Sequence, residues 1–311
     1  MRIVAISNQK GGVGKTTTAV NLAAALAEQG RRVLLIDLDP QGNASTHLGI
    51  DIYRLETSIY DVLTRGVELA RVVQPTSWEG LACVPSNIDL SSAEIEMVSA
   101  VGRETILKEA LFRLERDLKE SDHPGLDFVV IDCPPSLGLL SINALAAARE
   151  ILVPMQTEFF ALQGMSKLME VVEVVQQRIN PSLHLAGIVA CRMDTRTRLA
   201  SEVLEDIASH FPEILYETRI RQNVKLAEAP SYGQTVLEYA SESKGAEDYR
   251  QLAREYLGLP LMVDDDEGDE EDFEDEFEEE GDARVNEDVF EDEEEEELVI
   301  EANNGDLPAT S

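Results

Sequence analysis

Asn8-Gln9-Lys10-Gly11-Gly12-Val13-Gly14-Lys15-Thr16-Thr17 is the stretch that decides the fold. The apolar residues 3–6 precede it, and residues 18–28, rich in alanine and leucine, follow it. This order predicts a buried strand, a glycine-rich loop and a helix. Backbone N–H groups of such a loop point inward and the helix adds the positive end of its dipole, so the segment predicts a cradle for phosphate. The alternative is a glycine turn that happens to precede a helix.

The side chains of this loop indicate which ligand the cradle takes. Lys15 can reach the β- and γ-phosphates of a nucleotide, and the Thr16 hydroxyl can be a ligand of Mg²⁺. We therefore predict ATP and Mg²⁺ as cofactors. The expected nucleotide contacts come from Gly11, Gly12, Val13, Gly14, Lys15, Thr16 and Thr17.

Two further apolar runs, residues 32–37 and 127–132, each end in an aspartate. Ligands of open parallel sheets collect at the carboxyl edge, so we expect Asp37, Asp39 and Asp132 to face the phosphates. A Mg²⁺ and ATP site needs carboxylates near the metal and a group that orients the attacking water. The alternatives are that Asp39 only forms the turn before Pro40 and that Asp132 is an exposed strand-end residue.

The glycine loop departs from the ordinary G-x-x-x-x-G-K-[ST] pattern, because Gln9 replaces the first glycine and a second lysine stands at Lys10. It resembles the deviant Walker A loop, K-G-G-x-G-K-[ST], of one group of P-loop ATPases. The runs at residues 37–43 (Asp-Leu-Asp-Pro-Gln-Gly-Asn), 132–136 (Asp-Cys-Pro-Pro-Ser) and 226–231 (Leu-Ala-Glu-Ala-Pro-Ser) resemble the ParA/Soj partition ATPases in particular. The resemblance covers about residues 1–258.

The resemblance implies roles for individual residues. Lys10, Lys15 and Asp39 would be catalytic, with Lys10 of one subunit reaching the phosphates of the other and Asp39 positioning water. Thr16, Asp37 and Asp132 would support the Mg²⁺ shell. Asn223 and the segment through Pro230 would flank the adenine.

Strands and helices alternate along the chain, which predicts an α/β fold with a doubly wound, mostly parallel sheet, as in P-loop NTPases. We expect one ATPase domain over residues 1–260 and an acidic, disordered tail over residues 261–311. Trp78 is expected to anchor a loop rather than a partner. The expected strands are 2–7, 32–37, 81–85, 127–132, 150–154 and 184–190, and the expected helices are 16–29, 59–63, 69–73, 105–118, 142–148, 162–178 and 201–210.

Two clusters of basic residues suggest contacts to a phosphate backbone, and surface ion pairs are the alternative for both. The first holds Arg192, Arg196 and Arg198, and the second holds Arg219, Arg221 and Lys225. In the resemblance, Arg196 and Lys225 align with residues that contact DNA non-specifically. The family usually reads Ile-Pro-Arg-Asn-Val where residues 220–224 read Ile-Arg-Gln-Asn-Val, so the arginine is shifted by one position.

The net charge of −35 is concentrated at one end of the chain. Residues 264–311 hold 26 of the 61 acidic residues and one of the 26 basic residues, a net of −25. Such a composition buries too little apolar surface to offset the entropy of ordering, which predicts disorder. A solubilising tail, a partner-binding segment and a nucleic-acid mimic remain open as its role.

The cysteines and the apolar runs bear on the location of the protein. Three scattered cysteines without metal-ligand spacing predict a reduced, intracellular protein. The first strand begins at once after Met1, and no apolar run reaches the ~18 residues of a membrane span, so neither a signal peptide nor membrane insertion is expected.

The resemblance implies a cytoplasmic, nucleoid-associated partitioning ATPase that forms an ATP-dependent homodimer. The dimer would bind non-specific DNA, and a ParB-type centromere-binding partner would stimulate slow hydrolysis. The alternative is a membrane-associated positioning ATPase like MinD, although such chains end in a basic amphipathic helix and this one ends in acids.

Overall fold

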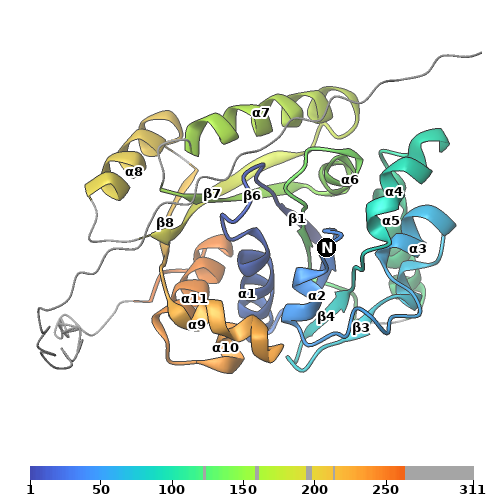
Figure 1. The fold of residues 1–311 in the computed structure, drawn as a ribbon, viewed down its shortest axis with the longest axis horizontal. Helices are drawn as coiled ribbons and strands as arrows, with labels where there is room; N and C mark the ends of the chain where they lie inside the picture. Colours follow the sequence, from blue (N-terminus) through green and yellow to red (C-terminus); the bar gives the residue numbers. More distant parts are fainter. Residues whose placement is uncertain (122–123, 158–160, 194–197, 213, 263–311) are drawn as a thin grey trace, which may run out of the picture. The chain divides into compact units, whose positions relative to one another are not determined.

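A single eight-stranded sheet organises the part of the chain that our computed structural model describes, residues 1–262 without 122–123, 158–160, 194–197 and 213. The strand order is β3-β4-β2-β5-β1-β6-β7-β8, and every neighbouring pair is parallel except β3 with β4. The predicted fold class is confirmed (Figure 1). The strands are β1 Arg2–Ile6, β2 Val33–Asp37, β3 Gln74–Pro75, β4 Leu81–Val84, β5 Phe128–Asp132, β6 Glu150–Gln156, β7 His184–Met193 and β8 Leu215–Arg221.

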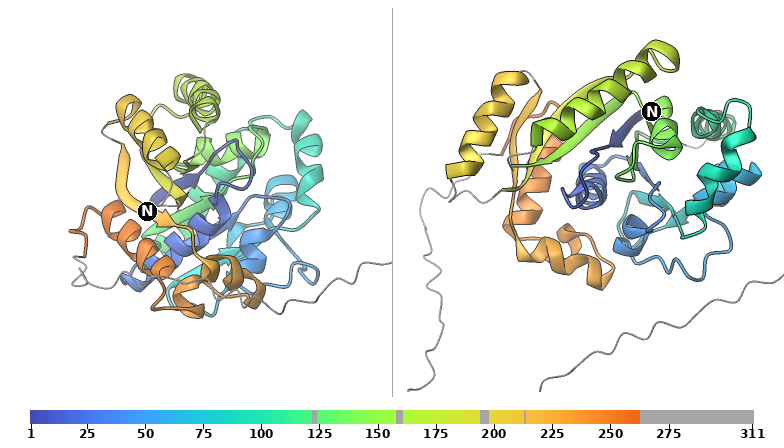
Figure 2. Two further views of the ribbon diagram at one scale, coloured as in Figure 1. Left: turned by 60° about the vertical axis from the view of Figure 1, so that its left-hand side comes forward. Right: turned by 45° about the horizontal axis from the view of Figure 1, so that its top comes forward.

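Helices cover both faces of this sheet, as a doubly wound fold requires. In Figure 1, α7 runs over β6 and β7, and Figure 2 shows α1 and α11 side by side from two further directions. The α-helices are α1 Lys15–Glu28, α2 Asn43–His47, α3 Ile59–Arg65, α4 Leu90–Glu96, α5 Ile106–Glu120, α6 Leu139–Ala147, α7 Ala161–Arg178, α8 Arg198–His210, α9 Val224–Glu228, α10 Val236–Tyr239 and α11 Lys244–Tyr256. The short 3-10 helices are η1 Leu69–Arg71, η2 Met97–Ser99 and η3 Ala229–Tyr232.

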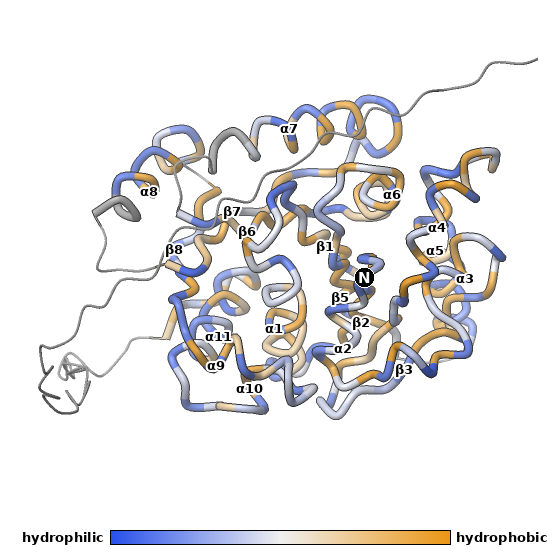
Figure 3. Tube along the Cα trace, in the orientation of Figure 1, coloured by the Kyte–Doolittle hydropathy of each residue, from blue (hydrophilic) through white to orange (hydrophobic). Residues whose placement is uncertain are grey.

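The central strands are apolar along their whole length because both of their faces are buried. Along β2, Leu34 and Ile36 pack into the core beneath α5 and α6, whereas Val33 and Leu35 pack into the core beneath α1 and α11. Figure 3 shows the same contrast, with β1, β2 and β5 largely hydrophobic and α7 and α8 mixed. Because successive side chains of a strand point to opposite faces, the sheet has one hydrophobic layer on each face.

The strand register brings the predicted site residues to one edge. Ile6 is the register partner of Asp132, and Asp132 is also the register partner of Asp37. The glycine loop begins directly after Ile6, so the loop and both aspartates meet at the carboxyl ends of β1, β5 and β2.

Most expected elements are present, with ends shifted by a few residues. Residues 69–73 form a 3-10 helix over Leu69–Arg71 rather than an α-helical piece. The elements without a sequence prediction are β3, β8, α2, α4, α9–α11, η2 and η3. Trp78 has the expected loop-anchoring contact, since its indole N–H donates to the carbonyl of Ala24 at 3.0 Å.

Candidate nucleotide-binding site

The glycine loop adopts a backbone that only glycine takes without strain. Gly12 and Gly14 have φ angles of 76° and 94°, in the left-handed region. Gly14 is the residue before α1, and no side chain caps that helix. The first N–H groups of α1 are therefore left for a bound anion, as the phosphate cradle requires.

Neighbouring strands hold the loop in this shape. The Asn8 side-chain amide donates to the carbonyl of Pro154 in β6 at 2.8 Å, and its oxygen accepts from the backbone N–H of Lys10 at 3.0 Å. The carbonyl of Gly12 accepts from the Gln156 amide at 3.2 Å and from the Arg192 guanidinium at 3.3 Å. Arg192 has φ 52°, so the end of β7 bends beside the loop. The cradle is thus anchored by β6 and β7.

Lys15 is the cation at the centre of the cradle. Its side chain is buried, and its ammonium group donates to the carbonyl of Lys10 at 3.2 Å. Burial lowers the pKa of Lys15, while the negative charges of Asp132 and Asp39 act in the opposite direction. A buried ammonium group in this position is suited to bind the negative charge of a phosphate.

Asp37 is fully buried and well bonded. Its carboxylate accepts from the Ser45 hydroxyl at 2.6 Å, from the Ser45 backbone N–H at 2.8 Å and from the Asp39 N–H at 3.2 Å. Burial raises the pKa of Asp37 to about 6, although the bonds from Ser45 act against that rise. Ser45 itself accepts from the backbone N–H of Ser86 at 2.9 Å, so the start of α2 fixes the orientation of this acid.

Asp132 is fully buried as well, but neither of its carboxylate oxygens has a hydrogen-bond partner among the described residues. Burial and the adjacent charge of Asp37 raise the pKa of Asp132 well above its usual range. An unsatisfied buried carboxylate is costly unless a cation or a donor compensates it. The Thr16 hydroxyl and the positive charge of Lys15 lie close enough to act against this rise of the pKa. The donor set of Asp132 and Thr16 therefore fits the oxygen-rich shell that Mg²⁺ prefers.

Asp39 lies nearer to the surface of the site. It is 8% exposed, and its Oδ1 accepts from the backbone N–H of Gln41 at 2.9 Å. Asp39, Gln41 and Asn43 line the cavity beside the loop. The turn geometry expected of Asp39 is thus present, and so is its access to the cavity.

A cavity of about 700 Å³ joins these elements. The predicted residues Gly11, Gly12, Gly14, Lys15, Thr16, Thr17, Asp39 and Asn223 line it. Val13 is buried behind the loop, and Pro230 belongs to η3 and is not among the lining residues. Leu226 and Ala227, which belong to the segment that the resemblance places beside the adenine, also line the cavity. So do residues without a site prediction, among them Cys191, Gln222 and Tyr249.

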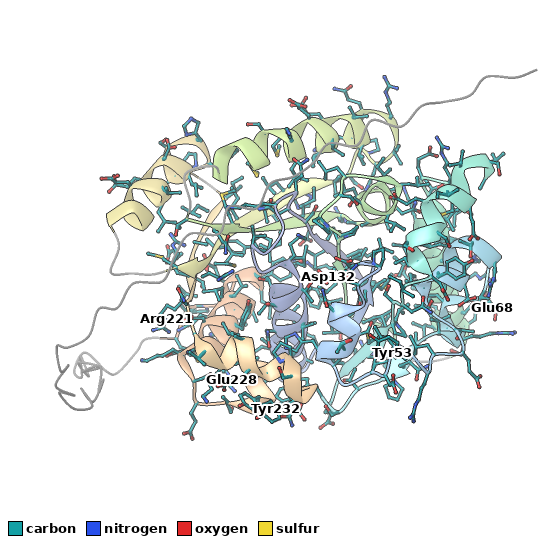
Figure 4. All side chains as sticks on the ribbon, viewed as in Figure 1. Tyr53, Glu68, Asp132, Arg221, Glu228 and Tyr232 are labelled. Atoms are coloured by element: carbon teal, nitrogen blue, oxygen red, sulfur yellow. The ribbon has the colours of Figure 1, made fainter. Side chains whose placement is uncertain are left out.

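The residues predicted to contact DNA lie in two different situations. Lys225 is exposed and pairs with Glu228 at 3.0 Å. Arg221 lines the cavity and pairs with Asp248 at 2.5 Å and Glu247 at 3.1 Å. Arg196 lies outside the described residues. Figure 4 labels Arg221 near the end of β8 and Asp132 at the centre of the molecule.

Comparison with known proteins agrees with this geometry. The family model described as an AAA domain matches residues 1–185. The sporulation initiation inhibitor protein Soj of Bacillus subtilis is 45% identical over 254 residues, which are 82% of this chain and 97% of the relative. The chromosome partitioning protein ParA of Myxococcus xanthus is 44% identical over 82% of this chain and 88% of its own length. The chain belongs to the ParA/Soj family of P-loop ATPases.

A solved structure supports the cofactors of this ParA/Soj chain. The crystal structure of cobyrinic acid a,c-diamide synthase from Mycobacterium smegmatis, with a bound ATP analogue and magnesium, is 38% identical to this chain and matches with a TM-score of 0.70. The match covers 85% of this chain and all of that one. ATP and Mg²⁺ are the cofactors of the site. Among the described residues, no helix combines the length and apolar character that a bilayer span needs.

Proposed function

We propose that this chain is a DNA-partitioning ATPase that works as a nucleotide-dependent switch. Two copies close face to face over ATP, the dimer binds DNA without sequence preference, and a ParB-type partner stimulates slow hydrolysis and release. The proposal draws on the names of the relatives and on the sequence of the loop.

The observation that carries the proposal is the open surface of the loop beside Lys10. Gly11 and Gly12 are exposed, and a Cβ atom added at either would meet nothing within 4 Å. A side chain at position 11 would therefore not disturb the subunit itself, whereas at position 12 the positive φ already favours glycine. The pair of glycines instead leaves room for a second backbone to approach, which a face-to-face dimer needs.

The roles of the polar residues follow from their positions. Lys10 of one subunit supplies positive charge to the phosphates of the other, where negative charge develops during phosphoryl transfer. Lys15 meets the phosphates within its own subunit. Asp39, which lines the cavity, orients the attacking water. Thr16, Asp37 and Asp132 support the magnesium shell, and the metal neutralises phosphate charge when bound.

DNA contact is proposed for Arg196 and Lys225, which the resemblance assigns to that role. Lys225 is 49% exposed while paired with Glu228, so exchanging that carboxylate for a phosphate costs little. Binding through phosphates alone predicts affinity that does not depend on base sequence and falls steeply with salt.

The test is a gel shift on random-sequence duplex DNA with ATP and Mg²⁺, with ADP and Mg²⁺, and without nucleotide. We expect a shift with ATP only, and Lys225→Ala is expected to weaken it roughly uniformly across sequences. DNA binding that is equal with ATP and with ADP would contradict the switch. Sedimentation with anionic liposomes in place of DNA would favour the membrane alternative.

A further inference from the structure

Arg221, the last residue of β8, is held by a buried acid of α11. Its backbone N–H donates to Asp248 Oδ2 at 2.8 Å, its Nε donates to Asp248 Oδ1 at 2.9 Å, and its Nη2 donates to the same Oδ1 at 2.5 Å. Nη2 also donates to Glu247 at 3.1 Å. The Asp248 side chain is 6% exposed and that of Arg221 is 34% exposed, so most of this pair is removed from water.

The pair lies at one defined end of the nucleotide cavity. The other end is lined by the residues that we assign to the phosphates, Gly11, Gly12, Gly14, Lys15, Thr16, Thr17 and Asp39. The lining also includes Gln222 and Asn223, between β8 and α9, and Tyr249 of α11. With its phosphates in the glycine loop, a nucleotide would place its nucleoside against these residues. This step rests on the nucleotide site described above.

The bonds from Asp248 fix the backbone that forms this end. Arg221 is followed directly by Gln222 and Asn223, which both line the cavity. Asn223 then begins α9, because its side-chain oxygen accepts from the N–H of Lys225 at 2.8 Å. A proline at position 221 would remove both the backbone donor and the guanidinium, so these contacts to Asp248 depend on arginine at that position.

We propose that Arg221 and Asp248 are a positioning pair for the nucleoside end of the ATP site and that Arg221 is not a DNA contact. Its guanidinium makes four hydrogen bonds to two carboxylates, counting both bonds of Nε to Asp248. Binding a DNA phosphate would require it to leave a mostly buried acid unpaired, which is strongly unfavourable. Lys225, paired once at the surface, has no such constraint.

Calorimetry with Mg²⁺-ADP and with Mg²⁺-pyrophosphate tests the pair on the full-length protein. Arg221→Gln keeps the backbone donor but removes the charge. We expect it to raise the Kd for ADP about tenfold, the size of a lost charged hydrogen bond, and to leave the Kd for pyrophosphate unchanged. Asp248→Asn is expected to act in the same direction. The double variant is expected to lose less than the sum of the two, because no charge is then left unpaired.

Arg250→Gln is the matched control. Arg250 lies on the same helix and makes a two-bond pair with Glu28 at 2.8 and 2.9 Å, but it does not line the cavity. Its loss is expected to leave the Kd for ADP unchanged. Arg221→Lys, which keeps the charge without the planar fork, is expected to give an intermediate Kd and serves if the glutamine variant fails to fold.

Three results would overturn the inference. The first is an unchanged Kd for ADP in Arg221→Gln and Arg221→Lys. The second is an equal loss of ADP and pyrophosphate binding. The third is weaker DNA binding by Arg221→Gln with intact ADP binding, which would make Arg221 a DNA contact. A wild-type protein that binds neither ligand would instead refute the nucleotide site itself.

Discussion

Asp37 and Asp132 are register partners at the carboxyl ends of β2 and β5, and both are fully buried. Ser45 and the Asp39 N–H satisfy Asp37, whereas Asp132 has no hydrogen-bond partner among the described residues. Asp132, which interacts with Thr16 and Lys15, is therefore available to a cation, whereas hydrogen bonds within the protein hold Asp37 in place.

Asp132→Asn is expected to separate stability from activity. Without nucleotide, the amide removes one of two adjacent buried acids, so the melting temperature should equal or exceed that of the wild type. ATP hydrolysis should fall roughly 10- to 100-fold at fixed Mg²⁺. Differential scanning fluorimetry and a Mg²⁺ titration of ATPase activity measure the two effects. A large drop in melting temperature with normal hydrolysis would contradict this assignment.

Ser45→Ala is expected to release Asp37. The hydroxyl bond to a charged acceptor is worth about 1.5–3 kcal/mol, and its loss leaves Asp37 buried with one donor fewer. We expect a lower kcat and a higher Mg²⁺ requirement, with little change in the Kd for ADP. Ser45→Thr keeps the hydroxyl and should restore activity. Equal kinetics for the alanine and threonine variants would show that the hydroxyl has no part in orienting Asp37.

We expect the buried side chain of His47 to make the folded protein less stable in mild acid. Burial lowers its pKa from 6.5 to about 4 in the folded protein. The free energy of unfolding is therefore unaffected by this group above pH 6.5 and decreases as the pH falls towards 4, because the unfolded chain binds the proton first. The effect is worth at most about 3 kcal/mol. Denaturant unfolding of wild type and His47→Gln between pH 7 and pH 4 should show a smaller loss in the variant, and parallel curves would refute it.

Gly233 and Gly66 form a matched pair for testing how η3 packs against the end of α2. Both have positive φ, at 65° and 67°. A Cβ on Gly233 would lie 2.8 Å from the Gly49 Cα, whereas a Cβ on Gly66 would meet nothing within 4 Å. Gly66→Ala should cost about 1–2 kcal/mol from backbone strain alone. Gly233→Ala should cost clearly more in urea unfolding, and equal costs would mean that the contact is loose.

Sequence reasoning located the elements whose signals are local. The glycine loop, Asp37 and Asp132 each follow a short apolar run, so their meeting at one sheet edge could be predicted from the order of the strands. The strand β8 could not, because Leu215–Arg221 mixes partly exposed, exposed and buried positions. The short helix α2 has no side-chain cap that a sequence pattern would reveal.

The residues missed at the site depend on contacts between distant parts of the chain. Ser45 and Asp248 have no motif of their own, and their roles appear only once β2 and α2, or β8 and α11, are brought together. Arg221 is the clearest example of a residue whose contacts the sequence did not reveal. Its position in a basic cluster suggested DNA, while the fold pairs it with Asp248 in the cavity wall.

The central claim is that Lys10 completes the site of a second copy over ATP. Multi-angle light scattering of wild type and Lys10→Ala, each with ATP and Mg²⁺ and with ADP and Mg²⁺, tests it most directly. The account predicts a wild-type dimer with ATP only, and a Lys10→Ala monomer in both nucleotides that still binds ADP with wild-type affinity. A Lys10→Ala variant that dimerises with ATP as the wild type does would contradict it.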